Sequence, residues 1–389
     1  MNERPTILFL PKWYPNHFDP QNGIFVQKHA IAISSFADVV VLFLCPSIDS
    51  SIKGIKKENP YPGITEYTFY YTSDTNSNIV IKTIQLIRYT YSLFKCLKVI
   101  RKNHKKIQIT HAHIMLRTGV ISLILKFFRK IPYIITEHWH GYLTGSFAQK
   151  NPVIKKITKI IVREAFAVTT VSDVLAEGMK KNKLYNKKYI TIPNVIDFET
   201  AKPIQNNTDE IIILCVSDLE DKNKNISGII KAFSAVKDKI SNAVLHIIGG
   251  GSDEEKLKKL VKDLELDPIV VFYGRQPNDF AISKIQQCSF VVINSYIETF
   301  SVVSAEALAC GKPIVATRCK GPESFLDETS TIWITPGNND ELKDALVKMS
   351  TNYTNYCPEK LQQIAKEKFS KEVVSLAFKN LYSDIVNLK

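Results

Sequence analysis

The sequence predicts an α/β protein built from two doubly wound domains, each a parallel sheet covered by helices. Short continuous apolar runs, typical of strands buried on both faces, alternate along the chain with longer segments of helical spacing. A chain of 389 residues is long enough for two cores of ordinary size. Charge divides the chain as well: residues 1–195 carry 28 Lys and Arg against 11 Asp and Glu, a net of +17, whereas the rest has a net of −4.

Composition is that of a globular protein, with 45% hydrophobic and 23% charged residues and no low-complexity tract. The seven cysteines are odd in number, widely spread and free of any CxxC pair, which favours reduced structural thiols in a cytosolic protein over a disulfide framework or a metal site. The apolar run near the start is too short for a signal peptide, and no run of about 20 apolar residues predicts a membrane span.

The amino-terminal half opens with a buried strand at 6–11 and a loop that leads to Gly23 and a helix from Ile24. A glycine at such a junction lets the backbone approach an anion closely, although a plain turn glycine explains it equally well. A second strand is expected at 37–44.

Basic amphipathic character marks three segments of this half, 79–103, 126–130 and 150–163. Their apolar faces either pack on the core, which we favour, or lie on a bilayer. The exposed Lys and Arg side chains would then attract an anionic membrane surface. We expect no nucleic-acid binding, because no nucleic-acid motif accompanies the charge.

Histidines follow two further strands, 107–116 and 132–142. The first ends in His111 and His113, and the second ends in Glu137, His138 and His140. The carboxyl edge of a parallel sheet is where such domains build sites. A His-x-His pattern raises the question of a metal, but no ligand set with convincing spacing completes it, so the sequence predicts none.

A polar linker at 198–210 predicts the domain boundary, giving domains of 1–197 and 198–369. Further strands are expected at 166–173, 189–197, 211–217, 270–276 and 331–336, with a strand, a glycine turn and a helix within 243–260. Two terminal helices are expected, at about 339–350 and 358–388.

The most informative stretch is 296–317, which follows an apolar strand at 289–294. It places Glu298 on a loop, Glu306 within a helix over 301–309, and a further strand after Gly311. A helix start after a parallel strand suits phosphate, and a carboxylate suits the hydroxyls of a ribose. The spacing of the two glutamates recurs elsewhere in the chain, so the surrounding pattern carries the signal.

This pattern closely resembles the nucleotide-sugar site of retaining GT-B glycosyltransferases of family GT4, and the likeness extends over essentially the whole chain. The resemblance implies two Rossmann-like domains facing each other across a cleft, with the last helix, about 370–389, packed back on the first. It implies that Glu298 contacts the transferred sugar, Glu306 the ribose and Lys224 the donor phosphates. His138 would lie beside the sugar and the β-phosphate.

The resemblance also extends the candidate site to further residues. It implies donor contacts from Gly23, Gly274, Arg275, Thr299, Phe300, Ser301 and Val302, and acceptor contacts from His113, Glu137 and His140. One position departs from the family pattern, because Asp218 stands where the family has an arginine. Lys222 and Arg275 are the candidates for supplying the missing positive charge.

The expected activity is therefore transfer of a sugar, with retention, from a UDP- or GDP-sugar to a hydroxyl of a glycan or lipid-linked glycan, without metal or other cofactor. By analogy, this suggests bacterial surface-polysaccharide synthesis (lipopolysaccharide or capsule) by a cytoplasmic enzyme peripheral to the inner membrane face. A GT-B epimerase or phosphorylase is the enzymatic alternative, although no pyridoxal-phosphate lysine signature supports it. The alternatives of another class are a non-catalytic nucleotide-sugar binder and a polyanion-binding module.

Overall fold

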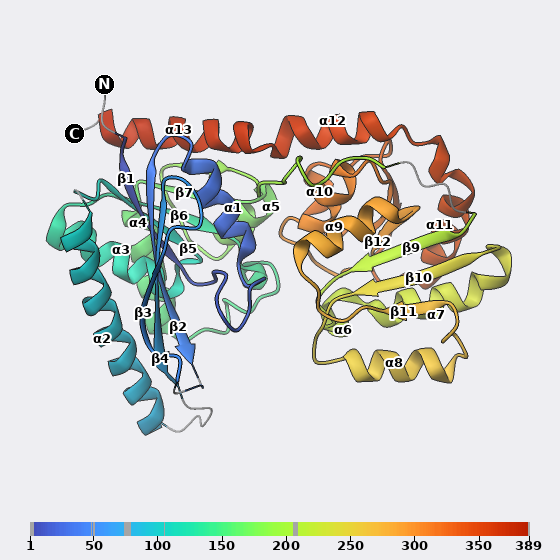
Figure 1. Ribbon diagram of the computed structural model, residues 1–389, viewed down its shortest axis with the longest axis horizontal. Helices are drawn as coiled ribbons and strands as arrows, with labels where there is room; N and C mark the ends of the chain where they lie inside the picture. Colours follow the sequence, from blue (N-terminus) through green and yellow to red (C-terminus); the bar gives the residue numbers. More distant parts are fainter. Residues whose placement is uncertain are drawn as a thin grey trace. The chain divides into compact units, whose positions relative to one another are not determined.

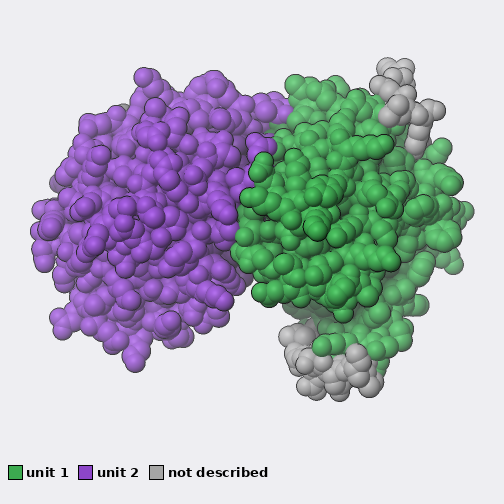
Figure 2. Space-filling model, turned by 180° about the vertical axis from the view of Figure 1, so that it is seen from behind, with its two compact units in different colours: residues 1–171, 175–192, 374–389 green, residues 172–174, 193–373 purple. Residues whose placement is uncertain are grey.

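The computed structural model describes residues 4–47, 49, 51–73, 79–104, 106–204 and 209–387. The chain forms two compact units, coloured separately in Figure 2. Unit 1 comprises residues 1–171, 175–192 and 374–389, and unit 2 comprises residues 172–174 and 193–373. The chain thus passes between the units near residue 193, a few residues before the linker chosen from the sequence.

Unit 1 contains an eight-stranded sheet in the order β3-β4-β2-β1-β5-β6-β7-β8. Its strands are β1 (Thr6–Pro11), β2 (Asp38–Ser47), β3 (Gly54–Glu58), β4 (Ile64–Thr72), β5 (Ile109–His113), β6 (Tyr133–Glu137), β7 (Ala167–Thr170) and β8 (Tyr189–Thr191). Its helices are α1 (Ile24–Ile33), α2 (Ile79–Asn103), α3 (Met115–Arg129), α4 (Pro152–Glu164), α5 (Asp173–Lys181) and α13 (Lys371–Asn387). Every pairing is parallel except that of the edge strand β3 with β4.

The two faces of this sheet are covered by different helices. Leu8 and Leu10 of β1 share a core cluster with residues of α2 and α3, on the side where α2 is visible in Figure 1. Phe9 points the other way and contacts the rings of His111 and His113 at 4.8 and 4.7 Å, on the side that α13 covers. Because the central strands are buried on both faces, they read as the continuous apolar runs seen in the sequence.

Unit 2 contains a six-stranded, fully parallel sheet in the order β11-β10-β9-β12-β13-β14. Its strands are β9 (Ile211–Val216), β10 (Ala243–Ile248), β11 (Val270–Phe272), β12 (Phe290–Ile293), β13 (Ile314–Thr317) and β14 (Thr331–Ile334). Its helices are α6 (Asp221–Lys224), α7 (Ile226–Val236), α8 (Glu254–Asp263), α9 (Asn278–Gln287), α10 (Val302–Ala309), α11 (Asn339–Asn352) and α12 (Pro358–Phe369). Two α/β units of this kind are the fold class that the sequence predicts.

Two of the local expectations described here were wrong, and one hairpin was missed. The hairpin of β3 and β4 was not foreseen. The strand expected at 107–116 ends at His113, because Ile114 takes a left-handed conformation with φ of 62° and α3 begins at Met115. The single helix expected at 358–388 is two helices, since Ser370 is extended, with ψ of 152°, between α12 and α13.

The last helix, α13, packs within unit 1. Its Tyr382 hydroxyl lies 2.7 Å from His111 Nδ1, and its Ser375 hydroxyl lies 2.7 Å from that of Ser35. Phe378 and Tyr382 are buried. The end of the chain therefore completes the core of the unit that its beginning forms.

Candidate functional site

A partly buried ion pair lies at the carboxyl end of the unit 2 sheet. Lys224, the last residue of α6, places its Nζ 2.5 Å from Oε1 of Glu298 on the loop after β12. Ser295 donates its hydroxyl to the same carboxylate oxygen at 2.7 Å. Burial by itself lowers the pKa of Lys224, but the neighbouring carboxylates of Glu298 and Asp218 raise it above the ordinary value. Lys224 thus stays an ammonium ion, held against the predicted sugar-contacting glutamate.

The backbone around Glu298 is fixed by a second segment. Glu298 donates its N–H to the carbonyl of Cys319 at 2.9 Å, and Gly321 donates to the carbonyl of Glu298 at 3.2 Å. A Cβ added at Gly321 would lie 2.7 Å from the nitrogen of Phe300 and 2.8 Å from the carbonyl carbon of Thr299. Only glycine allows this close approach of the two segments.

The loop then enters α10 through a left-handed residue. Ser301 has φ of 70° and ψ of 81°, and its hydroxyl lies 2.7 Å from that of Ser304. Phe300 is buried against Phe325 and Phe369, with ring centroids 5.1 and 5.2 Å apart. The aromatic cluster anchors the loop, so the backbone N–H groups of the first turn of α10, from Val302 on, hold a fixed direction.

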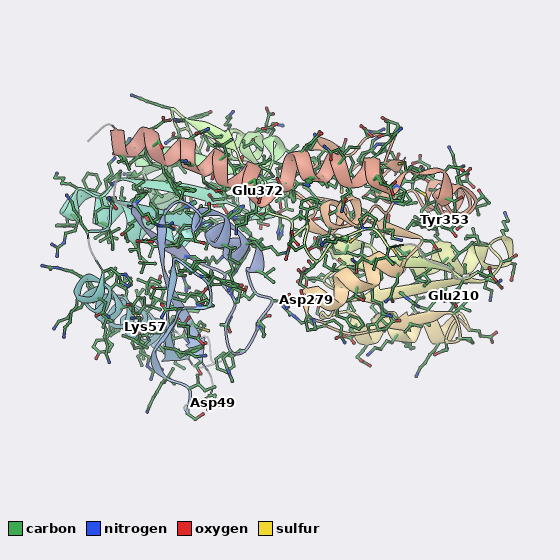
Figure 3. All side chains as sticks on the ribbon, turned by 45° about the horizontal axis from the view of Figure 1, so that its top comes forward. Asp49, Lys57, Glu210, Asp279, Tyr353 and Glu372 are labelled. Carbon is green, nitrogen blue, oxygen red and sulfur yellow. The ribbon has the colours of Figure 1, made fainter. Side chains whose placement is uncertain are left out.

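Glu306 lies inside α10 and is 2% exposed. Its Oε1 accepts a hydrogen bond of 3.0 Å from the side-chain amide of Asn278. Asn278 begins α9, next to Asp279, which is labelled in Figure 3. The sequence analysis did not select Asn278. The one local pattern that could have indicated it is a polar residue directly after Pro277 at a helix start.

A glycine turn after β10 packs against the loop after β9. Gly249 has φ of 146°, and a Cβ there would lie 1.8 Å from the carbonyl oxygen of Ser217. Gly249 also donates its N–H to the carbonyl of Gly274 at 2.9 Å. Gly274 itself has φ of 66° with no atom within 4 Å of an added Cβ, and Arg275 beside it is exposed. The candidate base-contacting residues therefore adjoin the glycine turn.

The position that departs from the family pattern lies beside Lys224. Asp218 is exposed on the loop after β9, close enough for its charge to act on Lys224. Lys222 is exposed on α6. The unusual aspartate therefore adds negative charge near the lysine, and the source of a compensating cation stays a hypothesis.

In unit 1, Glu137 is fully buried, and its carboxylate accepts hydrogen bonds from the backbone of its own unit. It accepts hydrogen bonds from the backbone N–H groups of His138 and Trp139 at 3.0 Å and of Met115 at 3.3 Å. Burial raises its pKa, and these N–H groups partly offset that effect. Glu137 therefore fixes the backbone of the loop after β6. The buried position of Glu137 does not support a contact with the acceptor.

The candidate histidines lie in different surroundings. His113 is fully buried, His138 is 7% exposed and their rings stack with centroids 5.9 Å apart. His140 is exposed at the start of a short 3-10 helix, His140–Tyr142. Of the three, His113 and His138 are brought together, and a further residue that the sequence did not select, His29 of α1, joins them at ring distances of 6.0 and 5.7 Å.

Gly23 begins α1 with φ of 66°. A Cβ at this position would lie 2.4 Å from the carbonyl carbon and oxygen of Trp13. The packing of its own loop accounts for this glycine, and its expected donor contact stays a prediction.

Comparison with known proteins assigns these features to one family. The family model described as Glycosyltransferase Family 4 matches residues 74–200, and that described as Glycosyl transferases group 1 matches residues 197–370. An uncharacterized glycosyltransferase of Methanocaldococcus jannaschii is 25% identical over 325 residues, covering 81% of this chain and 88% of the relative.

Solved structures share the fold. Sucrose-phosphate synthase from Thermosynechococcus elongatus superposes with a TM-score of 0.80 at 18% identity, over 99% of this chain and 100% of that one. Anabaena HepE in complex with UDP gives a TM-score of 0.73 at 16% identity, over 97% and 100% of the two chains. Together the two family models span residues 74–370, and the chain therefore belongs to the GT4-type glycosyltransferases with a GT-B fold.

Proposed function

We propose that this glycosyltransferase transfers a hexose, with retention of anomeric configuration, from a UDP- or GDP-sugar to a hydroxyl of a glycan or lipid-linked glycan. The observation that carries the proposal is the Lys224–Glu298 pair before the start of α10, with the carboxylate of Glu306 held inside that helix. A cation, helix N–H groups and two oriented carboxylates are the groups that a diphosphate, a sugar and a ribose require. The structure of Anabaena HepE with UDP supports a nucleotide diphosphate as donor.

Each group has a distinct task in this proposal. Lys224 and the first-turn N–H groups of α10 bind the diphosphate, and their stabilisation grows as negative charge develops on the leaving group. Glu298 orients the sugar hydroxyls, and Glu306 accepts hydrogen bonds from the ribose diol. His138 of unit 1 contacts the junction of sugar and β-phosphate.

The proposed bond changes occur on one face of the sugar. The bond between the anomeric carbon and the β-phosphate oxygen breaks, and the anomeric carbon forms its new bond to the acceptor oxygen. The acceptor's proton passes to an oxygen of the leaving diphosphate. Protein cations stabilise that diphosphate, so we propose that the reaction proceeds without a metal.

The central test is replacement of the cation. Lys224→Met is expected to lower kcat/KM for the donor by about 10²–10³, the usual cost of removing one such group. Lys231→Met, which removes an exposed lysine of α7, is the matched control and should leave the rate unchanged. A Lys224→Met enzyme with full activity on every UDP- and GDP-sugar tested would refute the assignment.

The same assay separates a catalyst from a non-catalytic binder. Donor hydrolysis and transfer are followed across a panel of UDP- and GDP-sugars, and donor binding is measured in parallel by calorimetry. Binding of a sugar nucleotide with neither transfer nor hydrolysis across the panel, even with lipid-linked glycans supplied, would favour the binder.

We further propose that the enzyme acts at an anionic membrane surface in bacterial surface-polysaccharide synthesis. Within the described residues, no helix is long and apolar enough to cross a bilayer. Apolar side chains nevertheless protrude from the basic helices α2 and α3: Leu86, Ile87, Tyr91 and Phe94 are 63–64% exposed, and Phe128 is 81% exposed. Such side chains beside lysines favour a bilayer over nucleic acid.

Unit 1 also contains a lysine-rich groove. It has a volume of about 410 Å³ and is lined by three lysines of α4 and two at and after the end of α5. These lysines are Lys155, Lys156, Lys159, Lys181 and Lys183. Basic residues close to an anionic bilayer each contribute about 1 kcal/mol of attraction.

Vesicle binding tests the membrane assignment. The protein should sediment with phosphatidylglycerol-containing vesicles and not with pure phosphatidylcholine, and the triple change Lys155→Gln, Lys156→Gln, Lys159→Gln should weaken binding at least tenfold. The charge-matched control changes three exposed lysines of α12 to glutamine. These lysines are Lys360, Lys366 and Lys368. Stronger binding to DNA than to vesicles across a salt series would instead indicate a polyanion-binding surface.

A further inference from the structure

Three histidines from separate elements of unit 1 converge in its interior. They are His29 in α1, His113 at the end of β5 and His138 after β6. Each offers one ring nitrogen, and these nitrogens all lie within 4.8 Å of one another. His29 and His113 have no solvent exposure, and His138 is 7% exposed.

Hydrogen bonding distinguishes this group from the neighbouring His111. His111 uses both ring nitrogens, Nδ1 with the hydroxyl of Tyr382 at 2.7 Å and Nε2 with that of Thr136 at 2.6 Å. Among the described residues, no hydrogen-bond partner is found for either ring nitrogen of His113. The same is true of Nε2 of His138. Buried polar atoms gain from a partner, so the nitrogens of these two stacked rings are suited to bind a ligand.

The surroundings keep these rings neutral. Burial lowers the pKa of His113 and His138 well below the ordinary value, and the neighbouring histidines lower it further. Aromatic rings line the cluster, with Phe25 4.5 Å from His138 and Phe9 4.7 Å from His113. A neutral imidazole with an accessible lone pair is the form that binds metals.

We propose that His29, His113 and His138 bind one divalent transition-metal ion, with Zn²⁺ as the representative ion. Imidazole suits Zn²⁺, Co²⁺ and Ni²⁺, and three protein nitrogens with one water complete a tetrahedral site. Zn–N bonds of about 2.0–2.1 Å place ligating nitrogens about 3.4 Å apart, so the rings close together on binding. The water takes the fourth position of this site.

The site has a consequence for the proposed reaction. The ion engages a nitrogen of His138, the residue that the proposed function sets beside the donor sugar. We expect metal binding to inhibit sugar transfer rather than to support it. This consequence rests on the proposed function, whereas the metal site itself does not.

Cobalt binding tests the site directly. Metal-free, tag-free protein is titrated with Co²⁺, and one equivalent is expected to produce the visible absorption bands of a tetrahedral complex. His29→Gln should weaken Co²⁺ affinity at least 100-fold, whereas His17→Gln, which changes an exposed histidine of unit 1, should leave it unchanged. Cys357→Ser, which removes the exposed thiol, should also leave it unchanged.

X-ray absorption on the Zn²⁺-loaded wild-type chain gives a readout that does not depend on any variant folding. Three imidazole nitrogens and one light oxygen ligand are expected. The proposal is overturned if sulfur ligands appear, if His29→Gln binds Co²⁺ as the wild type does, or if no stoichiometric binding occurs up to about 100 μM metal. Inhibition of transfer is measured separately, and its absence alone would count against the assigned role of His138.

Discussion

Each of the two glutamates flanking the start of α10 is held by a side chain from another helix. Lys224 of α6 binds Glu298, and Asn278 of α9 binds Glu306. A carboxylate that is already oriented loses little freedom when a ligand arrives, so both residues are prepared for their proposed contacts.

Loss of the ribose contact should affect binding more than chemistry. Glu306→Gln is expected to raise the donor KM about 10–100-fold with a smaller change in kcat, because a hydrogen bond to a charged group contributes about 1.5–3 kcal/mol. Steady-state kinetics with varied donor measures both constants. Glu367→Gln, on the exposed face of α12, is the control. An unchanged KM would remove Glu306 from the donor site.

The buried imidazoles make stability depend on pH. Burial holds the pKa values of His111, His113 and His138 well below the ordinary 6.5. As the pH falls below 6.5, the unfolded chain gains protons that the folded chain does not, so the free energy of unfolding should fall. Each imidazole contributes about 1.4 kcal/mol in total between about pH 7.5 and 5.5, because the unfolded imidazole gains most of one proton over this range.

Urea unfolding between about pH 7.5 and 5.5 measures this slope. Glu137 has the opposite effect, because burial raises its pKa and it gains its proton more readily in the folded chain. Removing one imidazole, as in His113→Phe, should reduce the slope. Stability that is constant over this range would contradict burial of neutral imidazoles.

At the scale of elements, the junction that starts α1 depends on one glycine. Gly23→Ala incurs about 1–2 kcal/mol for left-handed backbone and a further 1–3 kcal/mol from contact with the backbone of Trp13. Gly145→Ala is the matched control, because Gly145 has φ of 80° but nothing within 4 Å of an added Cβ. Chemical denaturation should find Gly23→Ala clearly the more damaging. Equal losses would show that packing on Trp13 is not the reason for the glycine.

At the scale of the whole molecule, the proposed nucleotide contacts other than that of His138 belong to unit 2. Lys224, Asn278, Glu298 and Glu306 lie between residues 193 and 373, and the unit has its own hydrophobic core. A fragment of residues 193–373 is therefore expected to fold and to bind UDP or GDP within about threefold of the full chain.

Calorimetry on the fragment and the full chain tests this expectation. Lys224→Met in the fragment serves as the control that binding uses the same site. A folded fragment that binds neither nucleotide, beside a full chain that does, would mean that unit 1 supplies part of the nucleotide site.

Much of the fold followed from local pattern. The runs that became β1, β9 and β12 are short and apolar because parallel strands are buried on both faces. The hairpin of β3 and β4 was missed since β3 is a polar edge strand, and the break at Ser370 was missed since both flanking segments have helical spacing.

The sequence by itself determined where Glu298 and Glu306 stand, because a strand, a loop and a helix start are properties of one continuous segment. Only the tertiary structure decided their partners, Lys224 at 74 positions from Glu298 and Asn278 at 28 from Glu306. The same holds for His29, which reaches His113 because β1 lies between β2 and β5 in the sheet. The spacing of buried residues is a property of one continuous segment. The order of strands, which brings distant segments together, depends instead on how the whole chain packs.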